Sequence, residues 1–150
     1  MSERKSMIRN LTRQTLVAEN EHYALNFFER LQGMIGKDFD RNLDCMVFPC
    51  CNSIHMFFMS RKLDVIFLDK ENRIVKIFTA KPWGIYSGGR NAVKVLELPE
   101  GSLQKSACSV GDILDPDAEK SGEKVKNKGG IRSFVFAEPA GDEKEKSKQY

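Results

Sequence analysis

The sequence predicts a mainly β domain, built either as a compact antiparallel sandwich of jelly-roll-like type or as a partly closed barrel, with one short N-terminal helix. Short runs of aromatic and β-branched residues recur along the 150-residue chain, and turn-forming residues separate them, which is typical of all-β folds. Helical periodicity is confined to one early segment. The chain is long enough to form one domain around a single core.

The first strand and the helix are predicted before residue 37. Arg13–Ala18 is short and rich in β-branched and aliphatic residues, as a strand requires. Asn20 then offers an N-cap, and Glu21 places a carboxylate in the first helical turn. Apolar residues follow at the spacing of one helical face: Ala24, Phe27, Phe28 and Leu31. Gly33 and Gly36 end this predicted helix.

A hairpin is predicted at the centre of the fold. Leu43–Phe48 is a strand that Pro49 ends. Two further apolar runs, Ile54–Met59 and Leu63–Leu68, flank a short basic link. Because both runs are rich in aromatic and branched residues, they are predicted to be neighbouring strands joined by a tight turn.

The second half of the domain continues the antiparallel pattern. Ile74–Ala80 alternates with period two and is predicted to be a strand. A long loop, Lys81–Asn91, precedes a strand at Val93–Leu98. A turn at 99–102 follows, where Ser102 is suited to cap a single helical turn, and Ile113–Leu114 is a last short apolar run.

Composition divides the chain into three parts. Residues 1–10 are predicted to be a flexible basic arm and residues 11–115 a single globular domain. Residues 116–150 are rich in Lys, Glu, Asp, Gly and Ser, so they are predicted to be a charged, largely disordered tail. One apolar island, residues 131–136, has the composition of an added edge strand.

The charge pattern argues against several classes of partner. The chain has 24 Lys and Arg against 21 Asp and Glu, a net charge of +3, with both signs interspersed. No groove-reading motif accompanies the basic arm, so nucleic acid is not expected as a partner. No run approaches the ~20 apolar residues of a membrane span, and the start lacks a signal-peptide core. We therefore expect a soluble, cytoplasmic monomer with reduced cysteines and no membrane partner.

Six sequence blocks together resemble a known family. They are Glu29-Arg30 with Gly33-Met34, Met46–Pro49, Ser53–Met59, Leu63–Asp69, Val95–Gly101 and Gly111-Asp112. In this order they are similar to the family called domain of unknown function 192, also known as uncharacterised protein family 0127, over about residues 11–115. The resemblance implies a mainly β sandwich of jelly-roll type with a small helix, and it implies no assigned activity.

A metal site is one hypothesis for the polar residues of the central segment. Cys50, Cys51 and His55 are ligand types that zinc prefers, with Cys45 or Asp64 as a fourth ligand. Structural zinc sites usually pair cysteines two to four positions apart, whereas adjacent cysteines on a strand point to opposite sides. The sequence therefore favours two loop thiols and a hydrogen-bonded histidine, and we expect no metal and no cofactor.

The same segment also contains the candidate catalytic residues Cys50, Cys51, His55 and Asp64. Cys50 or Cys51 would be the nucleophile and His55 the base, as a cysteine hydrolase requires. Asp64 and Glu97 lie inside apolar strands, where two carboxylates could act as acid and base. The alternative is that Asp64 is structural and is held by Arg30 or another cation, because a buried carboxylate needs a partner.

The loop after Ala80 is the preferred binding site. Its candidate ligand-binding residues are Lys81, Trp83, Tyr86, Gly88, Gly89 and Arg90. Two aromatic rings, two glycine amides and two cations together suit a small anionic or ring-bearing ligand. The alternative is that the aromatic residues only cap the open end of the sandwich.

The sequence thus favours a small binding or interaction module over an enzyme, with an unknown small molecule or protein as its partner. The alternative function is a cysteine- or metal-dependent hydrolase centred on Cys50, Cys51 and His55. A third hypothesis is a scaffold whose charged tail recruits a protein.

Overall fold

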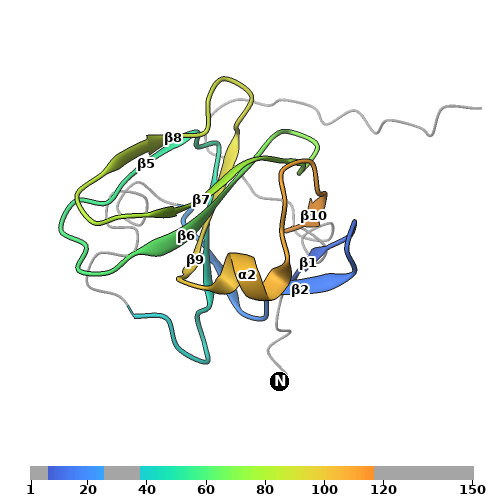
Figure 1. The fold of residues 1–150 in the computed structure, drawn as a ribbon, viewed down its shortest axis with the longest axis horizontal. Coiled ribbons are helices and arrows are strands. Elements are labelled where there is room, and N and C mark those ends of the chain that lie inside the picture. Colours follow the sequence, from blue (N-terminus) through green and yellow to red (C-terminus); the bar gives the residue numbers. More distant parts are fainter. Residues whose placement is uncertain (1–6, 26–37, 117–150) are drawn as a thin grey trace, which may run out of the picture.

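The computed structural model describes residues 7–25 and 38–116. The elements in this part of the chain are β1 (Ile8–Asn10), β2 (Thr15–Ala18), β3 (Glu21–Tyr23), β4 (Cys45–Pro49), β5 (Ser53–His55), β6 (Leu63–Leu68), β7 (Ile74–Ala80), β8 (Ile85–Ser87), β9 (Lys94–Pro99), α2 (Ser102–Ser106) and β10 (Leu114–Asp115). The strands form three sheets, ordered β10-β1-β2, β3-β4-β9-β6-β7 and β5-β8 (Figure 1). All pairs are antiparallel except β3 and β4, which are parallel.

The five-stranded sheet is buried on both faces around β6, which lies between β9 and β7. Every residue of β6 is buried. Because side chains alternate along a strand, Val65 and Phe67 face one core while Ile66 and Leu68 face the other. The continuous apolar run at Leu63–Leu68 is thus explained by a strand that meets no water on either side.

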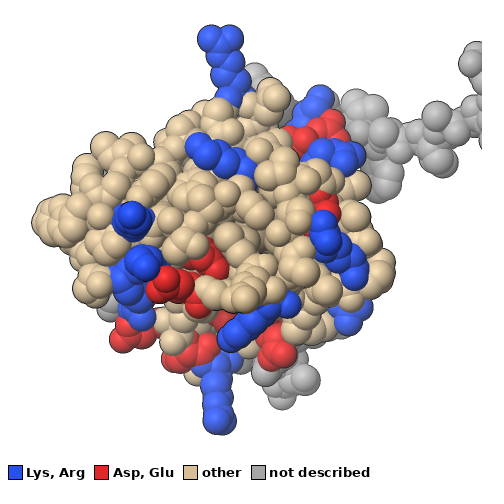
Figure 2. All heavy atoms as spheres, viewed as in Figure 1, with Lys and Arg blue, Asp and Glu red and all other residues tan. Residues whose placement is uncertain are grey.

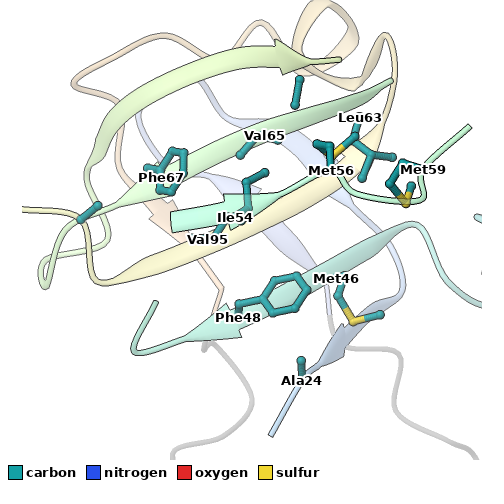
Figure 3. Packing of buried hydrophobic residues seen from close by; sticks show 12 residues of the cluster. Ala24, Met46, Phe48, Ile54, Met56, Met59, Leu63, Val65, Phe67 and Val95 are labelled. Carbon is teal, nitrogen blue, oxygen red and sulfur yellow. The ribbon is translucent and has the colours of Figure 1, made fainter. Parts of the chain in front are cut away.

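Smaller layers cover the two faces of this sheet. On one side, Ile54 of β5 packs into the core that contains Val65, Phe67 and Val95 (Figure 3). On the other side, Ile8 and Leu114 of the small three-stranded sheet pack with Ile66, and Leu103 of α2 lies against the same core. The predicted mainly β, sandwich-like class is confirmed, whereas none of the described sheets closes into a barrel.

The predicted central hairpin is wrong. Strand β5 ends at His55 and pairs with β8, in the register Ser53↔Ser87 to His55↔Ile85. Strand β6 pairs instead with β7 and β9. The apolar run continues past His55 as a turn, because Phe58 has a φ of 62° that no strand accommodates.

The predicted N-terminal helix is also wrong where the structure describes it. Glu21–Tyr23 forms β3, which pairs with β4 in the register Glu21↔Cys45 to Tyr23↔Val47. Asn20 is not an N-cap, since a strand follows it, and its backbone N–H donates to the Asp44 carboxylate (2.8 Å). Residues 26–37, the remainder of the predicted helix, lie outside the described residues.

The α-helix found within the described residues is α2. It begins at Ser102, in the turn at 99–102 where the sequence indicates a single helical turn. Its N-cap is Gly101, with a φ of 95°, and not Ser102. A helix of five residues is far too short to cross a bilayer, and no other described segment is a long apolar helix.

The end of the predicted basic arm belongs to the fold. Ile8–Asn10 forms β1, and Ile8 is fully buried. The Asn10 amide donates to the Asp112 carboxylate (2.8 Å), which also accepts from Arg13 Nε (2.6 Å). Residues 8–10 are therefore not a flexible arm, because β1 pairs with both β2 and β10. Residues 1–6 and the tail from 117, including 131–136, lie outside the described residues.

Two carboxyl groups are buried in the five-stranded sheet, and the first of them, Asp64 on β6, is 2% exposed. One of its oxygens accepts from the Thr79 hydroxyl (2.8 Å). The other accepts from the backbone N–H groups of Gly101 (2.9 Å) and Leu103 (3.0 Å). Asp64 therefore ties the start of α2 to the sheet, and in the described residues its donors are a hydroxyl and two amides, not the predicted cation.

The second buried carboxyl is Glu97 on β9, which is 5% exposed. Its cross-strand neighbours are the apolar residues Met46 and Val65. Burial raises the pKa of Glu97 from 4.5 to about 8. Glu97 therefore stays protonated near neutral pH. Asp64, by contrast, is fixed in place by the three hydrogen bonds that it accepts.

Replacing Asp64 with alanine is predicted to lower the free energy of unfolding by roughly 3 kcal/mol or more, because three donors lose their shared acceptor. Urea unfolding monitored by circular dichroism measures this change. Glu100→Ala is the control: its exposed pair with Lys62 (3.3 Å) should contribute less than about 1 kcal/mol. Equal losses in the two variants would contradict the structural role of Asp64.

Glu97→Gln is predicted to change how stability depends on pH. The unfolded chain loses the Glu97 proton near pH 4.5, whereas the folded protein keeps it to about pH 8. This residue therefore makes the free energy of unfolding fall as pH rises between these values. At pH 8 the variant should be more stable than the parent by roughly 3–5 kcal/mol, with little difference at pH 4. Urea midpoints across this range test it, and parallel profiles would contradict it.

Candidate functional site

Four rings form an exposed surface at one end of the molecule. His55, Phe57, Phe58 and Trp83 make up this aromatic surface. Trp83 is central, with its ring centroid 5.2 Å from that of Phe58 and 6.4 Å from that of Phe57. His55 stacks on Phe57 at 5.1 Å. Phe58 and Trp83 are 71% and 62% exposed, so these rings contact one another without being buried.

Two neighbouring turns hold the aromatic surface in place. The turn after β5 and the turn before β8 are joined by backbone hydrogen bonds from Met56 N to Gly84 O (2.8 Å) and from Trp83 N to Met56 O (2.7 Å). Phe58 and Trp83 have φ angles of 62° and 66°. This left-handed conformation costs a bulky residue roughly 1–3 kcal/mol, so the fold presents these rings at an energetic cost.

This end of the molecule carries little charge. In Figure 1 the β5–β6 and β7–β8 connections lie at the left. Figure 2, in the same view, shows this end as mostly uncharged, with Lys or Arg atoms beside it and mixed charges elsewhere on the face. The aromatic surface is thus an apolar patch with cations near its border.

Tyr86, predicted to line the site with Trp83, points the other way. Its ring lies 4.9 Å from Phe78, which in turn stacks on the buried Phe67 at 5.9 Å. Its hydroxyl accepts from Lys81 N (2.8 Å). Tyr86 therefore caps the core, which agrees with the alternative that the aromatic residues of this loop only close the sandwich. Trp83 does not cap the core, because it is 62% exposed.

The two glycines of the predicted loop have backbone roles. The Gly88 amide donates to Asn52 O (2.9 Å), and the Gly89 amide donates to the Ser87 hydroxyl (3.1 Å). A Cβ at Gly88 would lie 2.4 Å from the Phe67 ring, so only glycine fits there. Both amides thus already have acceptors. The two cations of this loop, Lys81 and Arg90, are exposed but lie on either side of β8, so the structure separates them.

The candidate catalytic and metal-binding residues have separate environments. Cys50 is exposed with a φ of 54°, and the Cys51 thiol donates to Ser53 O (3.0 Å). His55 belongs to the aromatic surface, and Asp64 is engaged at the start of α2. Among the described residues no three His, Cys, Asp or Glu side chains gather where they could hold a metal ion.

Cys45, the other proposed fourth ligand, is fully buried in β4. Burial raises the pKa of its thiol well above 9, and the negative charges of Asp44, Glu21 and Glu97 add to this effect. Since zinc binds the thiolate, this thiol is poorly suited to metal binding.

Sequence reasoning missed two of the exposed rings. Phe57 and Phe58 fall within an apolar run that was interpreted as a buried strand, yet they lie on a turn. The polar link at residues 60–62 is the available signal, because a turn that begins three residues earlier, at Phe57, exposes both rings. Trp83 lies on the loop that the sequence favours as a binding site, and it is 62% exposed.

Comparisons with known proteins agree with the predicted resemblance. The DUF192 family model, described as "Uncharacterized ACR, COG1430", matches residues 9–116. A UPF0127 protein of Thermococcus gammatolerans is 33% identical over 122 residues, which cover 79% of this chain and 80% of that protein. One from Pyrococcus furiosus is 30% identical over 71% of this chain and 94% of its own length. A shorter match, 38% identical, spans only 44% of the UPF0127 protein of Thermococcus sibiricus.

Solved structures share the fold. A putative transcription regulator from Sinorhizobium meliloti aligns with a TM-score of 0.63 and 22% identity, over 77% of this chain and 95% of that one. A protein of unknown function from Novosphingobium aromaticivorans aligns with a TM-score of 0.58 and 18% identity, over 73% and 81%. These similarities concern the fold alone. Because the family model spans most of the chain and two UPF0127 relatives match over most of its length, the chain belongs to the DUF192 family.

Proposed function

We propose that this chain is a binding module whose aromatic surface takes a small ligand that carries a flat ring. The observation that supports the proposal is the combination of high exposure and positive φ at both Phe58 and Trp83. Packing of the core does not explain these two rings, because both side chains stay exposed to solvent. A strained backbone that presents exposed rings is typical of recognition sites.

The surrounding residues favour a particular ligand chemistry. Trp83 and Phe58 offer apolar rings on which a planar group can stack. Lys81 is exposed two residues before Trp83 and supplies positive charge at this end of β8, whereas Arg90 lies beyond the other end of that strand. Since the Gly88 and Gly89 amides are engaged, side-chain charge would attract an anionic substituent. A ring-bearing anion should therefore bind more tightly than its neutral counterpart.

The arrangement supports binding better than hydrolysis. A cysteine hydrolase needs a thiolate, a base and an orienting group in hydrogen-bond reach of one another. Here His55 stacks on Phe57, and the Cys51 thiol is hydrogen-bonded to Ser53 O. The Asp64 carboxylate accepts from donors of β7 and α2, so it does not orient His55.

Fluorescence of Trp83 tests the proposal directly, because the chain contains a single tryptophan. Adenosine monophosphate, benzoate and glucose 6-phosphate are the probes, each compared with a neutral counterpart. A saturable change in emission is expected with at least one ring-bearing anion. Phe58→Ala should then weaken binding about tenfold, because one ring contact contributes roughly 1 kcal/mol or more while Trp83 still reports.

Val110→Ala is the matched control. Val110 is also 62% exposed but lies on the connection between α2 and β10, so its truncation should leave the affinity unchanged. No saturable response with any probe would contradict the proposal. A Phe58→Ala variant that binds as tightly as the parent would contradict the placement of the site.

A further inference from the structure

The two-stranded β5-β8 sheet turns one of its faces outward. Ile54 and Tyr86 stand opposite each other in the register and pack against the core. Alternation along both strands therefore directs the flanking side chains away from the core. These outward residues are Ser53 and His55 of β5, with Ile85 and Ser87 of β8. Because His55 also belongs to the aromatic surface, the outward face of this sheet and the aromatic surface are continuous.

A row of rings extends the outward face beyond the two strands. His55 stacks on Phe57 at 5.1 Å, and the ring centroids of Phe57 and Trp83 are 6.4 Å apart. The paired residues of the sheet alone span roughly 10 Å, whereas one base occupies ~3.4 Å along a stacked strand. The outward face and the row of rings together are therefore longer than one nucleotide, and they offer more than one ring for stacking.

The two segments that build this surface contain cations and no carboxylates. Of the 24 Lys and Arg in the chain, seven lie in residues 45–63 and 72–96, which contain none of the 21 Asp and Glu. The other 17 Lys and Arg share the rest of the chain with all 21 Asp and Glu, so the net positive charge comes from these two segments. The upper left part of Figure 2, where Figure 1 shows β5 and β8, has Lys and Arg atoms but no Asp or Glu.

Three of these cations lie at the two ends of the outward face. Lys81 is exposed at the aromatic end, two residues before Trp83. At the other end the Lys76 ammonium donates to Ser87 O (2.7 Å), a neutral acceptor that leaves its charge in place. Arg90 is exposed three residues after Ser87. A ligand that follows the outward face thus meets positive charge at both ends.

Two further cations follow the aromatic turn but have acidic partners. Arg61 pairs with Asp38, and Lys62 Nζ lies 3.3 Å from the Glu100 carboxylate. Since these carboxylates offset their charge, we assign Arg61 and Lys62 no part in binding.

We propose that the outward face of β5-β8, together with the aromatic surface, binds single-stranded nucleic acid. Proteins that hold single strands combine aromatic side chains, on which bases stack, with cations that contact the phosphates. The inference rests on the proposed function and extends it, because a nucleotide is a ring-bearing anion and a strand contains several of them. The sequence argues against a protein that reads the grooves of a duplex, and a single strand requires no groove-reading motif.

The arrangement fits a nucleic acid strand better than an anionic membrane. A site that enters the membrane interface gathers its apolar side chains on one face, with cations beside them. Here the outward face changes from rings at one end to the hydroxyls of Ser53 and Ser87 at the other. Charges at both ends of such a row fit the spaced phosphates of a strand.

The test measures binding of fluorescein-labelled thymidine and uridine decamers to the full-length protein by fluorescence anisotropy. At least one decamer should bind about a hundredfold more tightly than the matching monophosphate, because further stacked bases and phosphates add contacts. The logarithm of its affinity should fall with the logarithm of salt concentration with a slope of about −2, as expected for three cations on a single strand. The two decamers show whether DNA or RNA is preferred.

Arg90→Gln distinguishes a strand from a single nucleotide. Arg90 lies beyond the end of β8 that is away from Trp83. Its loss should weaken decamer binding severalfold and reduce the salt slope by about 0.7, while the fluorescence response of Trp83 to adenosine monophosphate stays unchanged. Lys105→Gln is the matched control, because this exposed cation on α2 should affect neither ligand.

Other outcomes would overturn the inference. Decamers that bind no more tightly than monophosphates contradict it but leave the proposed function intact, whereas the absence of a response to every ring-bearing anion contradicts both. A duplex of the same length that binds as tightly as the decamers would show that stacking on exposed bases is not needed. Binding to vesicles of phosphatidylserine and phosphatidylcholine, without binding to either decamer, would reassign the surface to a membrane.

Discussion

The structure depends on burial of the central sheet on both faces. Strand β6 is the clearest case, because every one of its six residues is buried. The five apolar ones divide between two separate cores. Each core then requires its own cover, which explains a small sheet on either side: β5-β8 over one face, and β10-β1-β2 with α2 over the other. A layered sandwich satisfies this requirement with short strands, whereas a single curved sheet would leave one face of β6 exposed.

The same burial governs the polar groups. Asp64 can remain in β6 because Thr79, Gly101 and Leu103 replace the water that it loses, and the short helix α2 is positioned as a result. For Glu97 no such donor is seen among residues 7–25 and 38–116, and burial raises its pKa to about 8, so it keeps its proton near neutral pH. The aromatic surface shows the opposite exception. There Phe58 and Trp83 are apolar side chains that remain exposed to water. Each of these departures from a plain apolar core identifies a position that packing alone does not explain.

Most of the strands could be predicted from the sequence. Alternation of apolar and polar residues, and continuous apolar runs, show which residues of a short segment are buried. The runs at Thr15–Ala18 and Ile74–Ala80 show this. Partners could not be predicted: β5 pairs with a strand about 30 residues later, and Glu21–Tyr23 becomes a strand because β4 lies beside it. For the same reason the sequence does not predict the exposure of Phe58, and it leaves open whether Tyr86 lines the site or caps the core. Neither can be determined without knowing which turn faces which strand.

The pairing of β1 with β10 bears on how the chain folds during synthesis. Arg9 lies opposite Asp115, so two segments from opposite ends of the domain must meet. Contacts between such distant segments form slowly, because a long loop has to close before they gain any stabilisation. On the ribosome, Asn10 and Arg13 emerge early but wait for Asp112, their shared acceptor, until nearly the whole domain has been made. Ile8 of β1 then lacks its contacts with Leu114 and the rest of its core for most of translation, and such uncovered apolar surface exposes a nascent chain to misfolding and to chaperones.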